Sequence, residues 1–593
     1  MEKLLPYYIR ELAIIRGYVR EFAQRFPRLA ALFGLNGEVN ADTSVERLIQ
    51  TTAFLCARIS WKLDHAHERF TNDLLGVQAP FYLRPIPSCS IVQVERTENT
   101  KGRTIARGTE LHMKASPACG FRTAYDVTLA PITVSARFLP RAEVPANLGL
   151  PKDVGCAIAI TIDTTQPSST LEEAASVPVR VHIDADSPVR VALYDALFMR
   201  ALGTYVEAGQ QWRKLLALPF AAVGLSKGEA LLPTPFDQEE SLRLLAEYFA
   251  FPDKFDFFDI DLKAVLAGCP SGTRQLTLHV LLPDLHHTRT PNLLRTMPAT
   301  VLRLGCTPVI NMFTQSAEPI RLRKRHTIYT LALPRTADSQ ATVYSLDAMK
   351  LVQAGNGGTA VDMQMFYGGS FSSQHRWLFE LAHPTMGTPD TVSFVDREQK
   401  PLQLGEGTVN ARVTCTNGAA PPNLPIGRAN GDLAARQDIG GGAIRMLRKP
   451  TAPLQLADHP DGHWDLIRIG HANHRNEAQQ NLKSLLHLLR MHARPECAVT
   501  ERQLAGILGI SRYVVDAWIK YTKGSALRNG YAISITIDEE AFTDRSIAVF
   551  ARVMESVLAY YMLLSNFIRV DILGKDGTVL LRGSLIHCVE TPA

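Results

Sequence analysis

The apolar residues at the start of the chain recur at alternating steps of three and four. They are Leu5, Tyr8, Leu12, Ile15, Val19, Phe22 and Phe26. This is the a/d spacing of a heptad, and it predicts a helix with one continuous apolar seam. The helix is expected to end at Pro27, because proline lacks a backbone donor and disfavours helix at the residue before it.

A second helix is expected to begin at Thr43-Ser44-Val45-Glu46, which has the spacing of a capping box. Its apolar row is Val45, Leu48, Thr52, Leu55, Ile59 and Leu63. Two such helices form a hairpin whose stripe must be covered, either by the hairpin itself or by helices of other chains. The strict three-four step favours a shared bundle of several long helices. The candidate interface residues are Leu5, Tyr8, Leu12, Ile15, Val19, Phe22, Val45, Leu48, Leu55 and Ile59.

After residue 81 the apolar period changes to the alternation typical of strands. Strands are expected at 90–96, 122–138, 157–164, 178–184, 275–282, 300–304, 327–333, 342–346, 531–537 and 567–581. Helices are expected at 188–202, 239–249, 476–492 and 546–566, and the Gly-rich segments 353–370 and 418–443 are interpreted as loops. The fold class is therefore α+β and multidomain. The expected parts are a helical segment at 1–80, β-rich domains with helical insertions at 81–340, a β- and loop-rich region at 341–445, and a mixed α/β domain at 446–593.

Composition and motif spacing give no indication of an enzyme, a cofactor or a metal site. The 593 residues are 46% hydrophobic and 20% charged with a net charge of +5, which is typical of globular chains. The nine cysteines are scattered without a CxxC pair, so we expect free thiols in a reducing compartment. No export signal opens the chain, and the apolar stretch 548–568 carries charges typical of a buried helix rather than a membrane span. These features predict a cytoplasmic protein that does not insert into a membrane.

Two local patterns could indicate other functions. His459, His463, His471 and His474 are close in sequence, but the turn residues between the first two argue against a shared metal. Residues 500–520 resemble a helix-turn-helix, with Gly506 and Gly509 near the turn and Val514 and Trp518 as anchors. A DNA-binding regulator that uses residues 500–520 is therefore the alternative function, although a helical hairpin within a larger domain explains the same pattern. The weak local positive charge argues against nucleic acid.

Sequence blocks along nearly the whole chain resemble the TssF family of type VI secretion baseplate proteins. The blocks include Leu4-Leu5-Pro6-Tyr7-Tyr8, Val45-Glu46-Arg47-Leu48, Tyr82-Leu83-Arg84-Pro85-Ile86-Pro87, Phe251-Pro252-Asp253-Lys254-Phe255, Cys306-Thr307-Pro308-Val309-Ile310-Asn311 and Leu447-Arg448-Lys449-Pro450-Thr451. The block at 251–255 is followed by Asp256, where the family usually has an apolar residue.

The resemblance implies a structural subunit rather than an enzyme. TssF-like chains pair as two copies with one TssG, and this unit forms a baseplate wedge with TssK and TssE. The wedges are expected to surround the VgrG hub, to dock through TssK at the cytoplasmic side of the inner membrane, and to prime assembly of the tube and sheath. The resemblance also implies that the N-terminal helices join a bundle with TssG and the second copy.

Overall fold

The computed structural model describes most of the chain between residues 4 and 587. Outside the described part are 1–3, 35–42, 79, 98–102, 142, 146–147, 167–168, 210, 234–239, 286–287, 324–325, 335–340, 354–359, 367–375, 381–388, 399, 403, 457–461, 471–480, 522–523, 561–566 and 588–593. The chain divides into two compact units, one formed by Met1–Leu83 with His459–Arg468 and the other by the rest.

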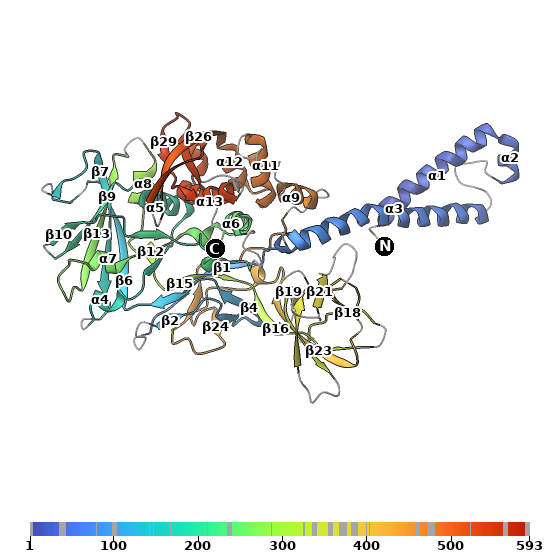
Figure 1. Ribbon diagram of the computed structural model, residues 1–593, viewed down its shortest axis with the longest axis horizontal. Coiled ribbons are helices and arrows are strands. Elements are labelled where there is room, and N and C mark those ends of the chain that lie inside the picture. Colours follow the sequence, from blue (N-terminus) through green and yellow to red (C-terminus); the bar gives the residue numbers. More distant parts are fainter. Residues whose placement is uncertain are drawn as a thin grey trace. The chain divides into compact units, whose positions relative to one another are not determined.

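The first unit is a helical hairpin. Its elements are α1 (Leu5–Arg25), α2 (Pro27–Leu32), α3 (Thr43–Gln78), the 3-10 turn η2 (Pro80–Leu83) and most of α9 (Gly462–Gly470). As predicted, α1 ends just before Pro27, which starts the next helix instead, and α3 begins at Thr43. The helices α1 and α3 run antiparallel (Figure 1). At about 1.5 Å per residue, the 36 residues of α3 span roughly 54 Å.

A closed six-stranded barrel lies at the centre of the second unit's topology. Its strands in order are β1 (Cys89–Val94), β15 (Cys306–Ile310), β4 (Ser116–Thr123), β3 (Glu110–Met113), β24 (Leu433–Ala435) and β25 (Ile444–Met446). Buried side chains such as Phe121, Val309 and Ile444 fill its interior. Strands that are more than 200 residues apart in sequence are therefore hydrogen-bonded neighbours, because β1 pairs with both β15 and β25. A short pair, β2 (Arg103–Ile105) with β5 (Val127–Leu129), lies outside the barrel.

Two further antiparallel sheets belong to this unit, and their strands come from the part of the chain between residues 132 and 303. One has the order β10 (Gln211–Lys214), β9 (Gly203–Ala208), β13 (Gln275–Pro283), β7 (Val154–Thr164), β6 (Ile132–Leu139). The other has the order β11 (Phe220–Ala222), β12 (Phe257–Ile260), β8 (Val179–Ile183), β14 (Leu302–Arg303). The helical elements between these strands are α4 (Leu171–Ala174), α5 (Ser187–Phe198), η4 (Lys227–Glu229), α6 (Glu240–Ala250), η6 (Pro252–Phe255), α7 (Leu262–Leu266) and α8 (Thr290–Arg295).

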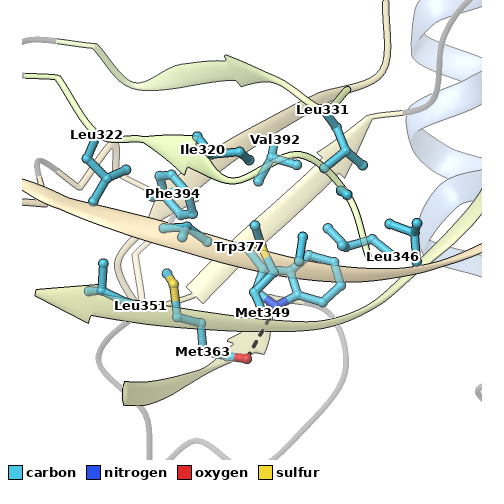
Figure 2. Packing of buried hydrophobic residues seen from close by; sticks show 14 of the residues in the cluster. Ile320, Leu322, Leu331, Leu346, Met349, Leu351, Met363, Trp377, Val392 and Phe394 are labelled. Atoms are coloured by element: carbon cyan, nitrogen blue, oxygen red, sulfur yellow. Dashed lines mark hydrogen bonds between the residues drawn. The ribbon is translucent and has the colours of Figure 1, made fainter. Parts of the chain in front are cut away.

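An eight-stranded sheet forms a further β-rich module. Its members are β16 (Phe313–Ser316), β17 (Ile320–Arg321), β18 (Ile328–Thr330), β19 (Thr342–Gln353), β20 (Ala360–Met365), β21 (Arg376–Glu380), β22 (Thr391–Val395) and β23 (Gly407–Thr416). Figure 2 shows its core, where Trp377 packs among aliphatic side chains and its Nε1 donates a hydrogen bond to the carbonyl oxygen of Met363 at 3.3 Å.

The interpretation of 353–370 and 418–443 as loops was wrong in part. The strand β20 falls within the first segment and pairs with β19, and β24 falls within the second and closes the barrel. Both strands are short and carry few of the large β-branched residues that mark a strand in sequence, so long-range pairing decides their conformation. The 3-10 turn η7 (Pro421–Asn423) also lies in the second segment.

The C-terminal part contains a mixed five-stranded sheet together with several helices. Its elements are α11 (Leu482–His492), α12 (Ala498–Ala505), β26 (Ile507–Tyr521), β27 (Gly524–Ile537), η8 (Glu539–Phe542), α13 (Ile547–Tyr560), β28 (Phe567–Gly574), β29 (Val579–Leu581) and β30 (Ile586–His587). The strands β27 and β28 are parallel, and α13 lies in the connection between them, as a parallel pair requires. The helix α13 is buried on several sides, which confirms a buried helix in the apolar stretch near residue 550.

The helix-turn-helix interpretation of residues 500–520 was wrong. After α12 the chain enters β26, which is a continuous strand paired with β27, so the expected recognition helix does not form. The alternative interpretation as a helical hairpin is wrong for the same reason. The β-branched pair at Val514 and Val515 suits a strand at least as well as a helix anchor. The observed helices and sheets together confirm an α+β fold.

Candidate protein–protein interface

The α1 seam predicted from the sequence lies mostly on the side of α1 that packs against α3. Tyr8, Leu12, Ile15, Val19 and Phe22 are half-buried. Two polar contacts between the helices lie on this same side and fix their pairing.

These contacts join each half of α1 to α3. Arg16 Nη2 lies 2.7 Å from Glu46 Oε1, and Ser60 Oγ donates a hydrogen bond to Glu11 Oε1 at 2.9 Å. The pairing of a low-numbered residue of α1 with a high-numbered residue of α3 fits the antiparallel arrangement seen in Figure 1.

The face of α3 that closes the hairpin is a different row from the predicted interface. Its buried residues are Ile49, Ala53 and Ala57. Alanines four residues apart leave room for another helix to approach closely, so this row forms the core between the two helices of the hairpin. The sequence contained this signal in the spacing of the two alanines, but the larger side chains of the predicted row obscured it.

The predicted row on α3 instead forms an exposed apolar stripe. We call Leu48, Leu55, Ile59 and Leu63 the outer stripe; their exposed fractions are 70%, 52%, 58% and 66%. At about 100° per residue, the outer stripe is centred roughly 120° around the axis from the buried alanine row. Val45, the remaining α3 residue of the predicted interface, is half-buried near the start of the helix.

The stripe adjoins a polar face of the same helix. Arg47, Thr51, Arg58 and Lys62 are exposed there. Because one side of α3 is charged and another is buried, the outer stripe is a distinct third face. A row of four large aliphatic side chains in water is typical of a surface that another protein covers.

Further exposed apolar side chains lie on the other helices of the hairpin. Leu5, from the predicted set, and Ile9 are exposed near the start of α1. Phe26, Leu29 and Leu32 are exposed around α2. Sequence reasoning missed Leu29 and Leu32, since a six-residue helix has too few turns to show a periodic pattern.

Near the C-terminal end of α3, the helix α9 also contributes to the first unit. The rings of Phe70 and Trp464, the latter on α9, lie 6.1 Å apart between centroids at an interplanar angle of 41°. A contact between residues nearly 400 positions apart left no signal in the sequence. It shows that the hairpin is tied to a later part of the chain.

The buried charges of the second unit make structural contacts. Glu247 Oε1 accepts hydrogen bonds from the backbone N–H of Leu231 at 3.0 Å and of Leu232 at 2.9 Å, and from Arg243 Nη1 at 2.8 Å. Its other oxygen pairs with Lys254. Burial alone would raise the pKa of Glu247, but the two cations and the amides outweigh it and hold that pKa low.

A second group of charged side chains connects three segments that are separate in sequence. Arg190 on α5 contacts Asp256 at 2.8 Å and Asp253 at 3.2 Å, and Arg448 contacts Asp184 at 2.9 Å. Burial raises the pKa of Asp256 to about 8 against the opposing effect of Arg190. Asp256, where the resemblance implies an apolar residue, therefore lies beside Arg190 in the interior, where burial opposes its ionisation.

The described residues hold no group of three His, Cys, Asp or Glu side chains placed to bind a metal ion. Of the four histidines close together in sequence, His463 lies on α9, and the other three are outside the described residues. All eight cysteines in the described part of the chain are free thiols. No helix among the described residues has the length and apolar content needed to cross a membrane.

The fold and the exposed apolar faces define a multidomain structural protein built for assembly. Comparison with known proteins agrees. Residues 1–580 match the family model for TssF of the type VI secretion system. The type VI secretion system component TssF1 of Pseudomonas aeruginosa is 28% identical over 617 aligned residues, which cover 98% of each chain. This chain therefore belongs to the TssF family and is a structural component of the type VI secretion baseplate.

Two solved structures share its fold. One is a chain in a TssK-TssF-TssG baseplate subcomplex, with a TM-score of 0.69 and 22% identity, covering 91% of this chain and 99% of that one. The other is a chain in a baseplate complex of the type VI secretion system, with a TM-score of 0.56 and 18% identity, covering 98% and 99%.

Proposed function

We propose that this protein is a wedge subunit that assembles with TssG, TssK and TssE around the VgrG spike hub and primes assembly of the tube and sheath. The wedge docks through TssK on the membrane complex, so the protein acts at the cytoplasmic side of the inner membrane. Membership in the family and the baseplate complexes that contain similar chains support this proposal.

The observation that carries the proposal is the outer stripe on α3. Fully burying one Leu or Ile side chain contributes about 1.5–3 kcal/mol. The four side chains of the outer stripe are already about one-third to one-half buried in the free chain. Covering their remaining surface therefore contributes on the order of 4 kcal/mol to association. Helices of TssG and of a second copy of this chain are the partners that fit a long apolar stripe, because they complete a bundle.

The α1 residues of the predicted interface have a different part in this proposal. Tyr8, Leu12, Ile15, Val19 and Phe22 are half-buried, so they hold α1 on α3 and also line the bundle at their exposed edges. An Asp at Ile15 or Val19 would open the hairpin itself, whereas an Asp in the outer stripe faces water until a partner binds. The outer stripe therefore gives the cleaner test of a shared bundle.

The proposed mechanism is mechanical. The rigid sheets and internal ion pairs of the second unit transmit a change of packing between wedge subunits when the sheath is triggered, and no chemical step is required. The test is sheath assembly in cells that lack the gene, followed with a fluorescent sheath subunit. We expect no sheaths in the deletion and normal sheaths on return of the wild-type gene. Normal sheath assembly in the deletion strain would contradict the proposal.

A further inference from the structure

The strand β26 forms a long free edge. It pairs with β27 along its full length, from Ile507 opposite Ile537 to Tyr521 opposite Gly524. The next strand, β28, pairs only with the 531–537 part of β27. The distal half of the hairpin is thus a two-stranded ribbon, and within the described residues the outer edge of β26 pairs with no strand.

One face of this ribbon exposes three large apolar side chains. Val514, Trp518 and Leu527 have exposed fractions of 63%, 68% and 53%. The first two alternate with residues of the other face, and Trp518 lies directly opposite Leu527 across the two strands. An exposed apolar edge strand is a hazard for aggregation unless another chain covers it.

We propose that a second copy of this chain pairs with this edge, β26 against β26, antiparallel about a two-fold axis at Val514. A closed two-fold pair uses the same strand from both copies and leaves no new edge on β26. The proposal concerns a surface separate from the helical hairpin and does not depend on the bundle proposed above.

The charges along β26 support this occupant. Val514 is the midpoint of β26, so a pair centred there overlaps the two strands completely. In that register Arg512 of each copy lies opposite Asp516 of the other, and Ile510 lies opposite Trp518, each twice by symmetry. Asp516 is exposed and makes no ion pair among the described residues, whereas Arg512 stacks over the Tyr531 ring at 4.8 Å.

Other registers centred within two residues of Val514 lack this match. A pair centred on Arg512 or on Asp516 puts that charge opposite its own copy, and a pair centred on residue 513 or 515 leaves Arg512 and Asp516 opposite uncharged residues. Like charges directly opposite each other destabilise a strand pair, so among the centres from 512 to 516 the charges favour Val514.

Cross-linking tests the axis directly. In full-length Val514→Cys protein the two introduced thiols face each other across the axis, so a mild oxidant should link two chains through the thiol at position 514. Leu527→Cys is the matched control, because that exposed side chain is on the same face but on the inner strand, and it should not cross-link above the wild-type level. Failure of the Val514→Cys protein to link through position 514 would overturn the proposal.

A charge exchange tests the register. In sedimentation of the full-length chain, Asp516→Arg should weaken self-association about tenfold, because it places like charges opposite each other twice. The double variant R512D/D516R restores both opposite-charge pairs and should restore association. The proposed pairing would be contradicted if Asp516→Arg left self-association unchanged. It would also be contradicted if the double variant did not restore self-association.

Discussion

At the scale of single residues, the second unit buries several ionisable side chains in its interior. Glu247, Arg243 and Lys254 are fully buried, although such residues are usually solvated. The spacing of Arg243 and Glu247 places them one turn apart on α6, and the fold brings Lys254 and the amides of 231–232 to the same carboxylate. Each charge in this group therefore has an opposite charge or a hydrogen-bond donor beside it.

His492 makes the stability of the protein sensitive to pH. Its Nδ1 donates a hydrogen bond to the carbonyl oxygen of Leu488 at 2.9 Å, and burial lowers its pKa from 6.5 to about 4. Between these values the unfolded chain binds more protons than the folded one, so stability falls as pH falls from about 6.5 to about 4. The loss from this residue should total about 3 kcal/mol.

The measurement compares denaturant unfolding of the wild-type protein and a His492→Gln variant at several pH values. The difference between the two isolates His492 from the other groups that titrate in this range. We expect the wild type to lose stability relative to the variant on acidification. Parallel curves from pH 7 to pH 4 would show that His492 is not a buried neutral imidazole.

At the scale of helices and strands, sequence periodicity predicted the elements whose own residues determine their conformation. The helices α5 and α6 and the strand β13 lie within a few residues of their expected positions. The strand β26 was missed because Gly506 and Gly509 imitate a turn between helices, while its partner β27 decides its conformation. On α3 the apolar row was recognised, but which of two rows faces α1 depends on the close fit of Ala53 and Ala57.

The buried carboxylate of Glu247 ties α6 to η6 and to the amides of Leu231 and Leu232. Its burial could not be predicted, because it depends on these distant segments. Replacing it with Gln removes the negative charge that balances Arg243 and Lys254 inside the protein. We expect Glu247→Gln to destabilise the second unit by about 3 kcal/mol or more, because unpaired buried charges are costly. Urea unfolding gives the difference.

The control is Glu143→Gln, which breaks the exposed pair between Arg137 and Glu143. That change should shift the free energy of unfolding by no more than about 0.5 kcal/mol. If both substitutions lowered the free energy of unfolding equally, burial of the charges around Glu247 would not determine their contribution to stability.

At the scale of the whole molecule, the sequence predicted the fold class but not the connectivity. The barrel joins β1, β15 and β25 from three distant parts of the chain, and no local pattern indicates which strands pair over such separations. The domain ranges 1–80, 81–340, 341–445 and 446–593 remain a proposal. The order of family-like blocks did predict membership in the TssF family.

The central claim is that the outer stripe on α3 is the surface by which this subunit joins its wedge. The double variant L55D/I59D should fold normally, because both side chains are exposed in the free chain. Burying its two carboxylates in a bundle should cost about 3 kcal/mol or more, which is a loss of at least about a hundredfold in affinity for TssG.

Co-purification of TssG with the L55D/I59D variant is the most direct test of this claim. Arg58→Asp is the control, because Arg58 lies between the two positions in sequence but on the polar face of α3. Circular dichroism should show the same helix content and melting temperature for both variants. We expect TssG to be recovered with wild type and with Arg58→Asp but not with L55D/I59D. Full recovery of TssG with a correctly folded L55D/I59D chain would contradict this role of the outer stripe.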